Sequence, residues 1–258
     1  MLDVLQFGSL MIRLDWLLMG VSGIAGYGAL KHALKKSAFA DRPLPDKLLN
    51  AFIIAFLVWK LSPLLYAPSL LWTFPLGVLI MPGNTAGVWL GAGAALLYMD
   101  RALWTMKIPR LFFADLMALG WVTAMLVYSL LDKQYGTTTH LPWGISLENP
   151  DFRYHPVNIY IFLVTLPMWI WLWRKSSVLL GTGNMILNVL IYYGMGLMLV
   201  SIFKTKTSAF YGLSREQILY LLMITTGWIL SVFLERTNRR KRTPAVDSNQ
   251  VEPETGRD

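Results

Sequence analysis

The chain contains no cysteine and only three histidines among its 258 residues. The absence of cysteine excludes disulfide bonds, thiolate catalysis and metal sites with cysteine ligands. The three histidines, His32, His140 and His155, are dispersed along the chain, which argues against a dedicated metal centre. No metal site and no cofactor are therefore predicted.

Charged residues are scarce too, at 15% of the chain, whereas soluble domains carry about 25%. Hydrophobic residues make up 55%, and the mean hydropathy is +0.48. Apolar runs close to the ~20 residues that cross a bilayer recur along the whole length. These runs are continuous rather than alternating, which favours helices over a membrane barrel. The sequence predicts an all-α polytopic membrane protein.

About seven membrane spans are predicted, followed by a polar tail. The spans are Ser9–Leu30, Leu48–Leu65, Pro75–Met99, Leu111–Leu131, Val157–Trp173, Val178–Phe203 and Gln217–Leu234. Residues 1–234 thus form one membrane domain, whose longest polar interval is the loop 132–156. The tail 235–258 is first basic and then polar and acidic, so it cannot bury a core and is predicted to be disordered.

The distribution of Lys and Arg predicts the orientation of the spans. One set of connections and the tail carry 16 of these residues, and the opposite set carries five. By the positive-inside rule, the N-terminus and the loop 132–156 lie outside, and the C-terminus is cytoplasmic. The net charge of +8 is spread over short blocks between apolar runs, so a nucleic-acid partner is not predicted.

Two of the three histidines, His140 and His155, lie in the polar interval between the fourth and fifth spans. With nearby charged residues they could form an acid–base pair at the outer surface. These charged residues are Asp132, Lys133, Asp151 and Arg153. The alternative interpretation of His155-Pro156 is a structural turn before a helix, because proline restricts the backbone.

The third apolar run is interrupted by residues 81–85, Met-Pro-Gly-Asn-Thr. A break of this kind is tolerated only where protein or water satisfies the backbone. Residues 75–81 are therefore expected to be a re-entrant or interfacial piece, and residues 87–99 the true helix. Asn84 and Thr85 are either site residues in the outer half of the bilayer or a helix cap.

Other residues in the spans have structural interpretations. Arg13 and Asp15 are two residues apart, so they are expected to face different sides of a helix as interfacial anchors. Asp115 lies in the first turn of its span, where an acid favours the helix dipole. Gly20, Gly26 and Gly28 are expected to allow close helix packing.

Short segments along most of the chain match a known pattern. They are Phe7–Arg13, Gly87–Tyr98, Ala114–Leu116 with Gly120, Tyr135-Gly136, Leu141–Gly144, His155-Pro156 with Tyr160, Tyr193-Gly194, and Gly212–Ser214 with Gln217. In this order they resemble the prolipoprotein diacylglyceryl transferase family. The resemblance implies a multi-pass protein of the bacterial plasma membrane. The family moves a diacylglyceryl group from phosphatidylglycerol to the cysteine thiol of a prolipoprotein.

The chain departs from the family at the positions that carry its chemistry. Thr85-Ala86-Gly87 replaces His-Gly-Gly, and residues 127–134 lack the family's Arg, Asn and Glu. Ile161, Leu197 and Ser201 replace an acid, an arginine and an acid. Binding a phosphate diester calls for fixed positive charge, usually Arg. Activating a thiol calls for a nearby base or a depressed pKa.

The preferred interpretation is a divergent member that keeps the scaffold without the transfer reaction. It would bind a membrane phospholipid such as phosphatidylglycerol, a prolipoprotein or another membrane protein. The alternative is an active acyl- or diacylglyceryl-type transferase with relocated catalytic residues, His140 and His155. A transporter or channel is less favoured, since no internal repeat is obvious. The predicted lipid- or substrate-binding residues are Asn84, Thr85, Trp143, Arg153, Asn158 and Tyr160.

Overall fold

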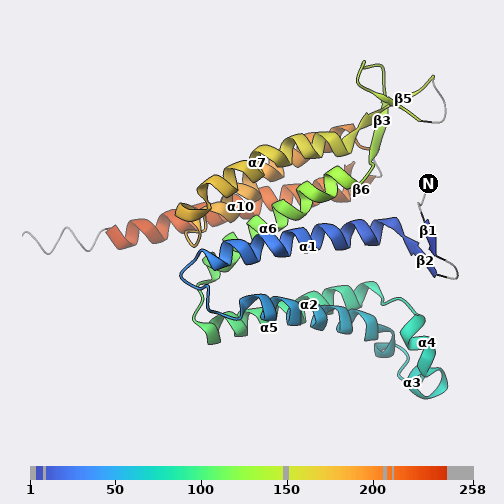
Figure 1. The fold of residues 1–258 in the computed structure, drawn as a ribbon, viewed down its shortest axis with the longest axis horizontal. Coiled ribbons are helices and arrows are strands. Elements are labelled where there is room, and N and C mark those ends of the chain that lie inside the picture. Colours follow the sequence, from blue (N-terminus) through green and yellow to red (C-terminus); the bar gives the residue numbers. More distant parts are fainter. Residues whose placement is uncertain (1–3, 8–9, 148–150, 206–207, 211, 243–258) are drawn as a thin grey trace, which may run out of the picture. The chain divides into compact units, whose positions relative to one another are not determined.

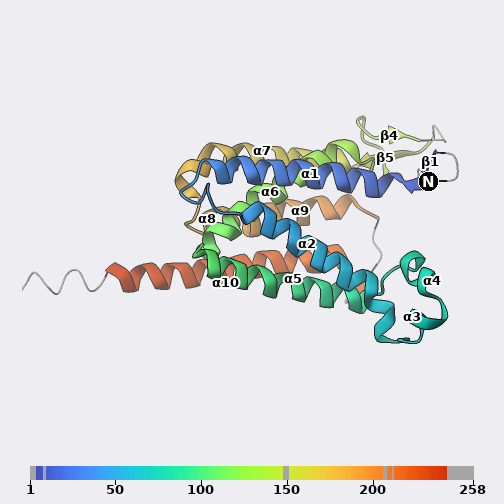
Figure 2. The same cartoon turned by 60° about the horizontal axis from the view of Figure 1, so that its bottom comes forward.

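A computed structural model describes residues 4–7, 10–147, 151–205, 208–210 and 212–242. Contacts divide the chain into two compact units. The first unit comprises Met1–Leu30 and Ala114–Asp258, and the second comprises Lys31–Phe113. Figure 1 shows the path of the chain, and Figure 2 shows the same ribbon turned by 60°.

Helices dominate both units. Their bounds are α1 Leu14–Lys35, α2 Leu44–Leu61, α3 Leu70–Thr73, α4 Pro75–Ile80, α5 Thr85–Met106, α6 Arg110–Leu131, α7 Val157–Leu179, α8 Asn184–Asn188, α9 Gly194–Val200 and α10 Arg215–Arg242. A 3-10 turn, η1 (Ser62–Leu65), extends α2, and another, η3 (Ser201–Phe203), follows α9. A π-helical segment, η2 (Val189–Tyr193), joins α8 to α9.

Within the described residues, five helical segments are long and apolar enough to cross a membrane. They are Leu44–Leu65, Arg110–Leu131, Val157–Leu179, Asn184–Phe203 and Arg215–Arg236. The chain is therefore an all-α membrane protein. The other two predicted spans correspond to α1 and α5, which are 22 residues long but contain glycines and charged side chains that lower their hydropathy.

The interruption predicted in the third apolar run is confirmed in the second unit. Helix α4 ends at Ile80 and α5 begins at Thr85. Helices α2 and α5 pack closely, because a Cβ atom added to Gly91 of α5 would lie 2.6 Å from the backbone oxygen of Ala55 in α2. Small residues at such a crossing let two backbones approach.

An ion pair links α5 to the start of α6. Arg110 Nε lies 2.7 Å from Asp100 Oδ1, and Arg110 Nη2 lies 3.1 Å from Asp100 Oδ2. This bidentate arrangement lowers the pKa of the Asp100 carboxyl, because the guanidinium donates hydrogen bonds to its charged form. Lys107, with φ 56°, ends α5 in the left-handed conformation and makes room for the short turn.

Helices α1 and α6 cross closely in the first unit. A Cβ atom added to Gly26 would lie 2.6 Å from the backbone oxygen of Gly120 and 3.0 Å from Ala124 Cβ. The prediction of a small packing face is confirmed at Gly26. A Cβ atom at Gly20 or Gly28 would meet nothing within 4 Å, so those two glycines take no part in this contact.

Three small antiparallel sheets accompany the helices and were not expected from the sequence. Strands β1 (Val4–Phe7) and β2 (Leu10–Arg13) form a hairpin, and β6 (Ser208–Phe210) pairs with β7 (Leu213–Ser214). Between α6 and α7, a sheet of order β3-β5-β4 uses Tyr135–Thr139, Arg153–Pro156 and Ile145–Ser146. Figures 1 and 2 place these strands at one end of the first unit and the C-terminal end of α10 at the other.

Two expectations about chain ends and charges need correction. Arg13 ends strand β2 rather than lying on a helix, and its Nη2 atom pairs with Asp15 Oδ2 at 2.8 Å. The two side chains therefore meet instead of facing different sides. Helix α10 continues past Leu234 to Arg242, so the polar tail begins later than expected. Residues 243–258 lie outside the described residues.

Candidate functional site

Asp115 of α6 holds the turn between α7 and α8. Its side chain is fully buried. Oδ2 accepts hydrogen bonds from the backbone N–H groups of Gly181 at 2.9 Å and Gly183 at 2.8 Å, and Oδ1 accepts one from Ile186 at 3.0 Å. Asp115 therefore caps the start of α8 rather than the first turn of its own helix. This contact fixes α6 against the segment that carries η2 and α9.

The π-helical segment η2 follows directly from α8. Segments of this kind are rare and frequently occur at functional sites. Tyr193, at the end of η2, is 1% exposed, and its hydroxyl lies 3.0 Å from Oγ1 of the buried Thr165 in α7. Leu190 of η2 and Leu197 of the following helix α9 line a cavity, while the Tyr193 hydroxyl bonds to α7.

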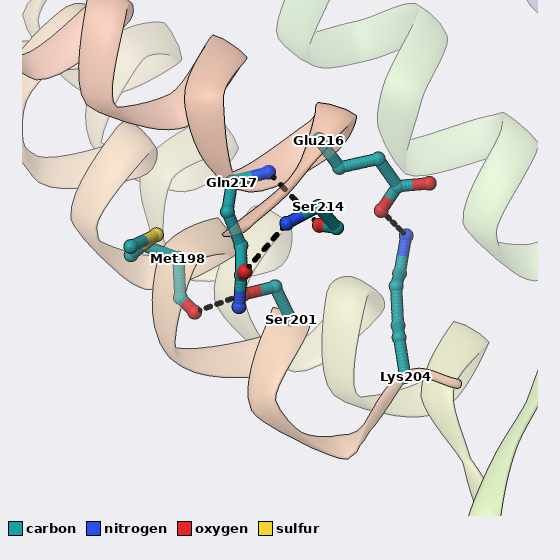
Figure 3. A network of polar contacts seen from close by, with 6 residues as sticks. All are labelled: Met198, Ser201, Lys204, Ser214, Glu216 and Gln217. Atoms are coloured by element: carbon teal, nitrogen blue, oxygen red, sulfur yellow. Dashed lines mark hydrogen bonds and ion pairs between the residues drawn. The ribbon is translucent and has the colours of Figure 1, made fainter. Parts of the chain in front are cut away.

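The start of α10 is fixed by a capping box and a buried glutamine (Figure 3). Gln217 Oε1 accepts from the backbone N–H of Ser214 at 3.0 Å, and the backbone N–H of Gln217 donates to Ser214 Oγ at 3.2 Å. Gln217 Nε2 also donates to Ser201 Oγ at 3.2 Å, and Ser201 Oγ donates to the backbone oxygen of Met198 at 2.6 Å. This network joins α10 to the end of α9.

A cavity of about 610 Å³ lies among α6, α7, η2, α9 and α10. Its volume is within the roughly 300–1,000 Å³ of pockets that hold small molecules. Most of the lining is apolar, and it includes Met125, Ile161, Leu190, Leu197 and Met223. The body of the cavity therefore suits a hydrocarbon chain.

Polar side chains gather at one end of the cavity, beside the sheets. Lys204 Nζ pairs with Glu216 Oε2 at 2.6 Å, as Figure 3 shows, and the Lys204 side chain is only 16% exposed. Asp132, Gln134 and Asn158 line the same cavity. Within the described part of the chain, the side chains of Gln134 and Asn158 make no hydrogen bond, so their amides can take a ligand.

The cavity is open between α6 and α10. Trp121 of α6 lines it and is 56% exposed, and Leu219 and Leu222 of α10 line it with 59% and 56% exposure. Large apolar side chains that are this exposed on a membrane helix face lipid. A polar end, an apolar body and an apolar opening together match the shape of an amphiphile.

The structure brings together three of the predicted site residues, two from the polar loop and one from α7. Trp143 Nε1 donates to the Tyr160 hydroxyl at 2.9 Å, and His155 Nδ1 lies 3.0 Å from the same oxygen. The His155 ring also packs on Phe203, with centroids 4.8 Å apart, and His155 is only 7% exposed. These contacts attach the β3-β5-β4 sheet to the start of α7, and His155-Pro156 ends strand β5 directly before that helix.

The two histidines lie at different places on this sheet. Pro156, next to His155, pairs with Tyr135, whereas His140 follows Thr139, which pairs with Arg153 near the other end of the ladder. His140 and Arg153 are exposed. Of the eight predicted site residues, Asn158 is the one found among the described lining of the cavity.

Asn84 and Thr85 belong to the second unit. Asn84 is the N-cap of α5, where its Oδ1 atom accepts from the backbone N–H of Gly87 at 2.7 Å. Its backbone N–H donates to Ser62 Oγ at 2.9 Å, and its Nδ2 donates to the backbone oxygen of Ser62 at 3.3 Å. The contact with Gly87 is a helix cap, the two contacts with Ser62 join the start of α5 to η1, and Thr85 begins the helix.

Lys204 and Glu216 were not predicted as site residues, and Asp132 was named only among the charges near the two histidines. Lys204 and Glu216 are 12 residues apart, and the strands β6 and β7 lie between them in the chain. One signal was present: Ile161 and Leu197, two positions at which the chain departs from the family it resembles, line the cavity. Among the described residues, no three His, Asp or Glu side chains come close enough to hold a metal ion.

The fold and the site define a polytopic helical membrane protein with a cavity inside its bundle. No family model matches the chain, and no curated protein matches it.

Proposed function

We propose that this protein is a non-catalytic membrane protein that binds a membrane phospholipid in the cavity of its first unit. The observation that carries the proposal is the match between the cavity and an amphiphile. The polar groups lie at one end, the body is apolar, and the opening between α6 and α10 is lined by exposed Trp121, Leu219 and Leu222.

The proposed lack of catalysis rests on the residues that line the cavity. Ile161 and Leu197 occupy positions where the resembled family carries an acid and an arginine, and neither can donate or accept a proton. Ser201, a third such position, is buried and donates to a backbone oxygen. The described lining contains no arginine and no histidine, so it lacks a bidentate phosphate ligand and a base near neutral pH.

Membership of the prolipoprotein diacylglyceryl transferase family, as a divergent member, belongs to the same proposal. So does a location in the bacterial plasma membrane, with seven spans, the N-terminus outside and the C-terminus inside. The excess of Lys and Arg on one set of connections supports this orientation. The strands and the C-terminal end of α10 lie at opposite ends of the first unit (Figure 2). This arrangement supports an odd number of spans between the loop 132–156 and the C-terminus, as the proposed orientation requires. A prolipoprotein or another membrane protein is the second kind of partner that this proposal allows.

Lipid analysis of the purified protein tests the binding. The full chain is extracted from its membrane in a mild detergent, and its bound lipids are measured by native mass spectrometry. Leu222→Trp, at the opening, is expected to reduce the bound lipid severalfold. Leu221→Trp is the matched control, because Leu221 neighbours it on α10, is 46% exposed and is not among the described lining residues. Equal lipid loss in both variants, or no bound lipid in the wild type, would contradict the proposal.

A second experiment tests the absence of transferase activity. The protein is expressed in a bacterium depleted of its own prolipoprotein diacylglyceryl transferase. We expect no growth and no lipidated precursor, while a functional transferase gene supplied in parallel restores both. Rescue of growth by this chain would contradict the proposal, because it would show that the chain catalyses the transfer. If the double variant His140→Ala/His155→Ala then failed to rescue growth, the catalytic residues would be assigned to the outer loop.

A further inference from the structure

The charges at the polar end of the cavity determine which headgroup it can hold. Among the described residues that line it, this end carries one basic side chain, Lys204, and two acidic ones, Asp132 and Glu216. The single positive charge is already paired, because Lys204 Nζ lies 2.6 Å from Glu216 Oε2. The end therefore carries an excess of one negative charge when all three groups are ionised.

An anionic headgroup fits this end poorly. Its phosphate would find no unpaired cation among the described lining residues, and it would lie close to two carboxylates. Juxtaposed like charges in a partly desolvated site repel each other and weaken binding. Breaking the Lys204–Glu216 pair to free the ammonium would leave Glu216 facing the incoming phosphate.

A headgroup that carries both a phosphate and a primary ammonium fits better. The Lys204 ammonium has three N–H donors, of which the contact with Glu216 uses one, so the others can reach a phosphate oxygen. The amides of Gln134 and Asn158 supply further donors. Asp132 and the second oxygen of Glu216 can then accept from the ligand's ammonium.

We infer that the cavity selects a phospholipid with a zwitterionic primary-amine headgroup, of the phosphatidylethanolamine class, over an anionic one. This inference rests on the proposed function, since it specifies the ligand of the same cavity. It differs from what the family resemblance implies, which is phosphatidylglycerol. A quaternary ammonium is disfavoured as well, because it has no N–H to donate to Asp132 or Glu216.

Competition between lipids with identical acyl chains tests the inference. The full chain is stripped of lipid in detergent, and then phosphatidylethanolamine, phosphatidylglycerol and phosphatidylcholine are added singly and in equal mixtures. Native mass spectrometry counts each bound species. We expect phosphatidylethanolamine to bind about tenfold more tightly than phosphatidylglycerol, which corresponds to about 1.4 kcal/mol.

Charge-neutralising variants assign the selectivity to the carboxylates. Asp132→Asn and Glu216→Gln are each expected to reduce the preference for phosphatidylethanolamine over phosphatidylglycerol by severalfold. Asp46→Asn, at an exposed position in the second unit, is the control and leaves the ratio unchanged. A melting curve for each variant establishes that the fold is retained, and the two separate acids keep the test valid if one variant unfolds.

The outcomes separate this inference from the proposed function. If no lipid binds, the proposed function fails. If phosphatidylglycerol binds as tightly as phosphatidylethanolamine or more tightly, lipid binding stands and the selectivity is overturned. Equal binding of phosphatidylcholine overturns the assignment to a primary amine. An unchanged ratio in both Asp132→Asn and Glu216→Gln overturns the role of the carboxylates.

Discussion

The carboxylate of Asp115 accepts a hydrogen bond from the backbone N–H of Gly183 at 2.8 Å, although the two residues lie on different segments of the bundle. Gly183 has φ 81°, a conformation that favours glycine, and it precedes the first residue of α8. The acid thus satisfies N–H groups that would otherwise be buried without a partner at the start of a helix.

Removal of this carboxylate is expected to destabilise the first unit strongly. Asp115→Ala leaves the N–H groups of Gly181, Gly183 and Ile186 without their acceptor. The expected cost is about 3 kcal/mol, or a Tm lower by about 6–12 °C. Asp41→Ala, at an exposed position, is the control and should change little. Thermal unfolding in detergent measures both, and equal melting temperatures would show that Asp115 does not hold the turn.

The crossing of α1 and α6 provides a matched pair of glycine variants. Gly26→Ala places a Cβ atom 2.6 Å from the Gly120 backbone oxygen, so the helices must separate, at a cost of about 1–3 kcal/mol. Gly20→Ala meets nothing within 4 Å and replaces a poor helix former, so its stability should stay equal or rise by up to about 1 kcal/mol. Melting curves for the two variants in one detergent compare them directly. Identical shifts would rule out close packing at Gly26.

Tyr160 is expected to hold the β3-β5-β4 sheet rather than to take part in chemistry. Tyr160→Phe removes the oxygen that meets both Trp143 Nε1 and His155 Nδ1. The expected cost to global stability is about 1 kcal/mol. The larger effect should be local, as faster trypsin cleavage after Arg153 on β5.

A neighbouring tyrosine provides the control for this prediction. The Tyr154 hydroxyl makes no hydrogen bond within the described part of the chain, so Tyr154→Phe should leave the rate of trypsin cleavage unchanged. If trypsin also cleaves Tyr160→Phe at the wild-type rate, the Tyr160 hydroxyl does not hold the sheet in place.

The sequence predicts the helices well because they depend on interactions between residues close together in the chain. Hydropathy is local, so the apolar runs and the break before Asn84 could be read directly, and the small packing face was found at Gly26. It predicts the site poorly because the site depends on contacts between distant segments. Lys204 pairs with Glu216 although β6 and β7 lie between them in the chain, and Asp115 caps a helix far along the chain. The helix dipole alone explains an acid such as Asp115 near the start of a span. The sequence alone therefore offers no reason to look for its hydrogen bonds to the start of α8.

Gln217 is expected to stabilise the polar end of the cavity. Gln217→Leu removes the acceptor of the Ser214 N–H and the donor to Ser201 Oγ, which should cost about 1–3 kcal/mol. Ser214→Ala removes only the acceptor of the Gln217 N–H and keeps the bond from Gln217 to Ser201, so its effect should be smaller. Thermal unfolding ranks the variants, and an equal loss in both would show that the side-chain hydrogen bonds of Gln217 contribute nothing measurable.

The absence of cysteine makes the number of spans directly testable by labelling. With seven spans, Asp41 lies inside and Ser69 outside. With only the five most apolar helices in the membrane and the loop 132–156 still outside, the two positions exchange sides. Both side chains are exposed, so Asp41→Cys and Ser69→Cys can react with a membrane-impermeant maleimide. We expect Ser69→Cys to be labelled in intact cells and Asp41→Cys only after permeabilisation, with His140→Cys as the outer reference. The reverse pattern would mean that α1 and α5 do not cross the membrane, because their glycines and charged side chains leave too little hydrophobic driving force for insertion.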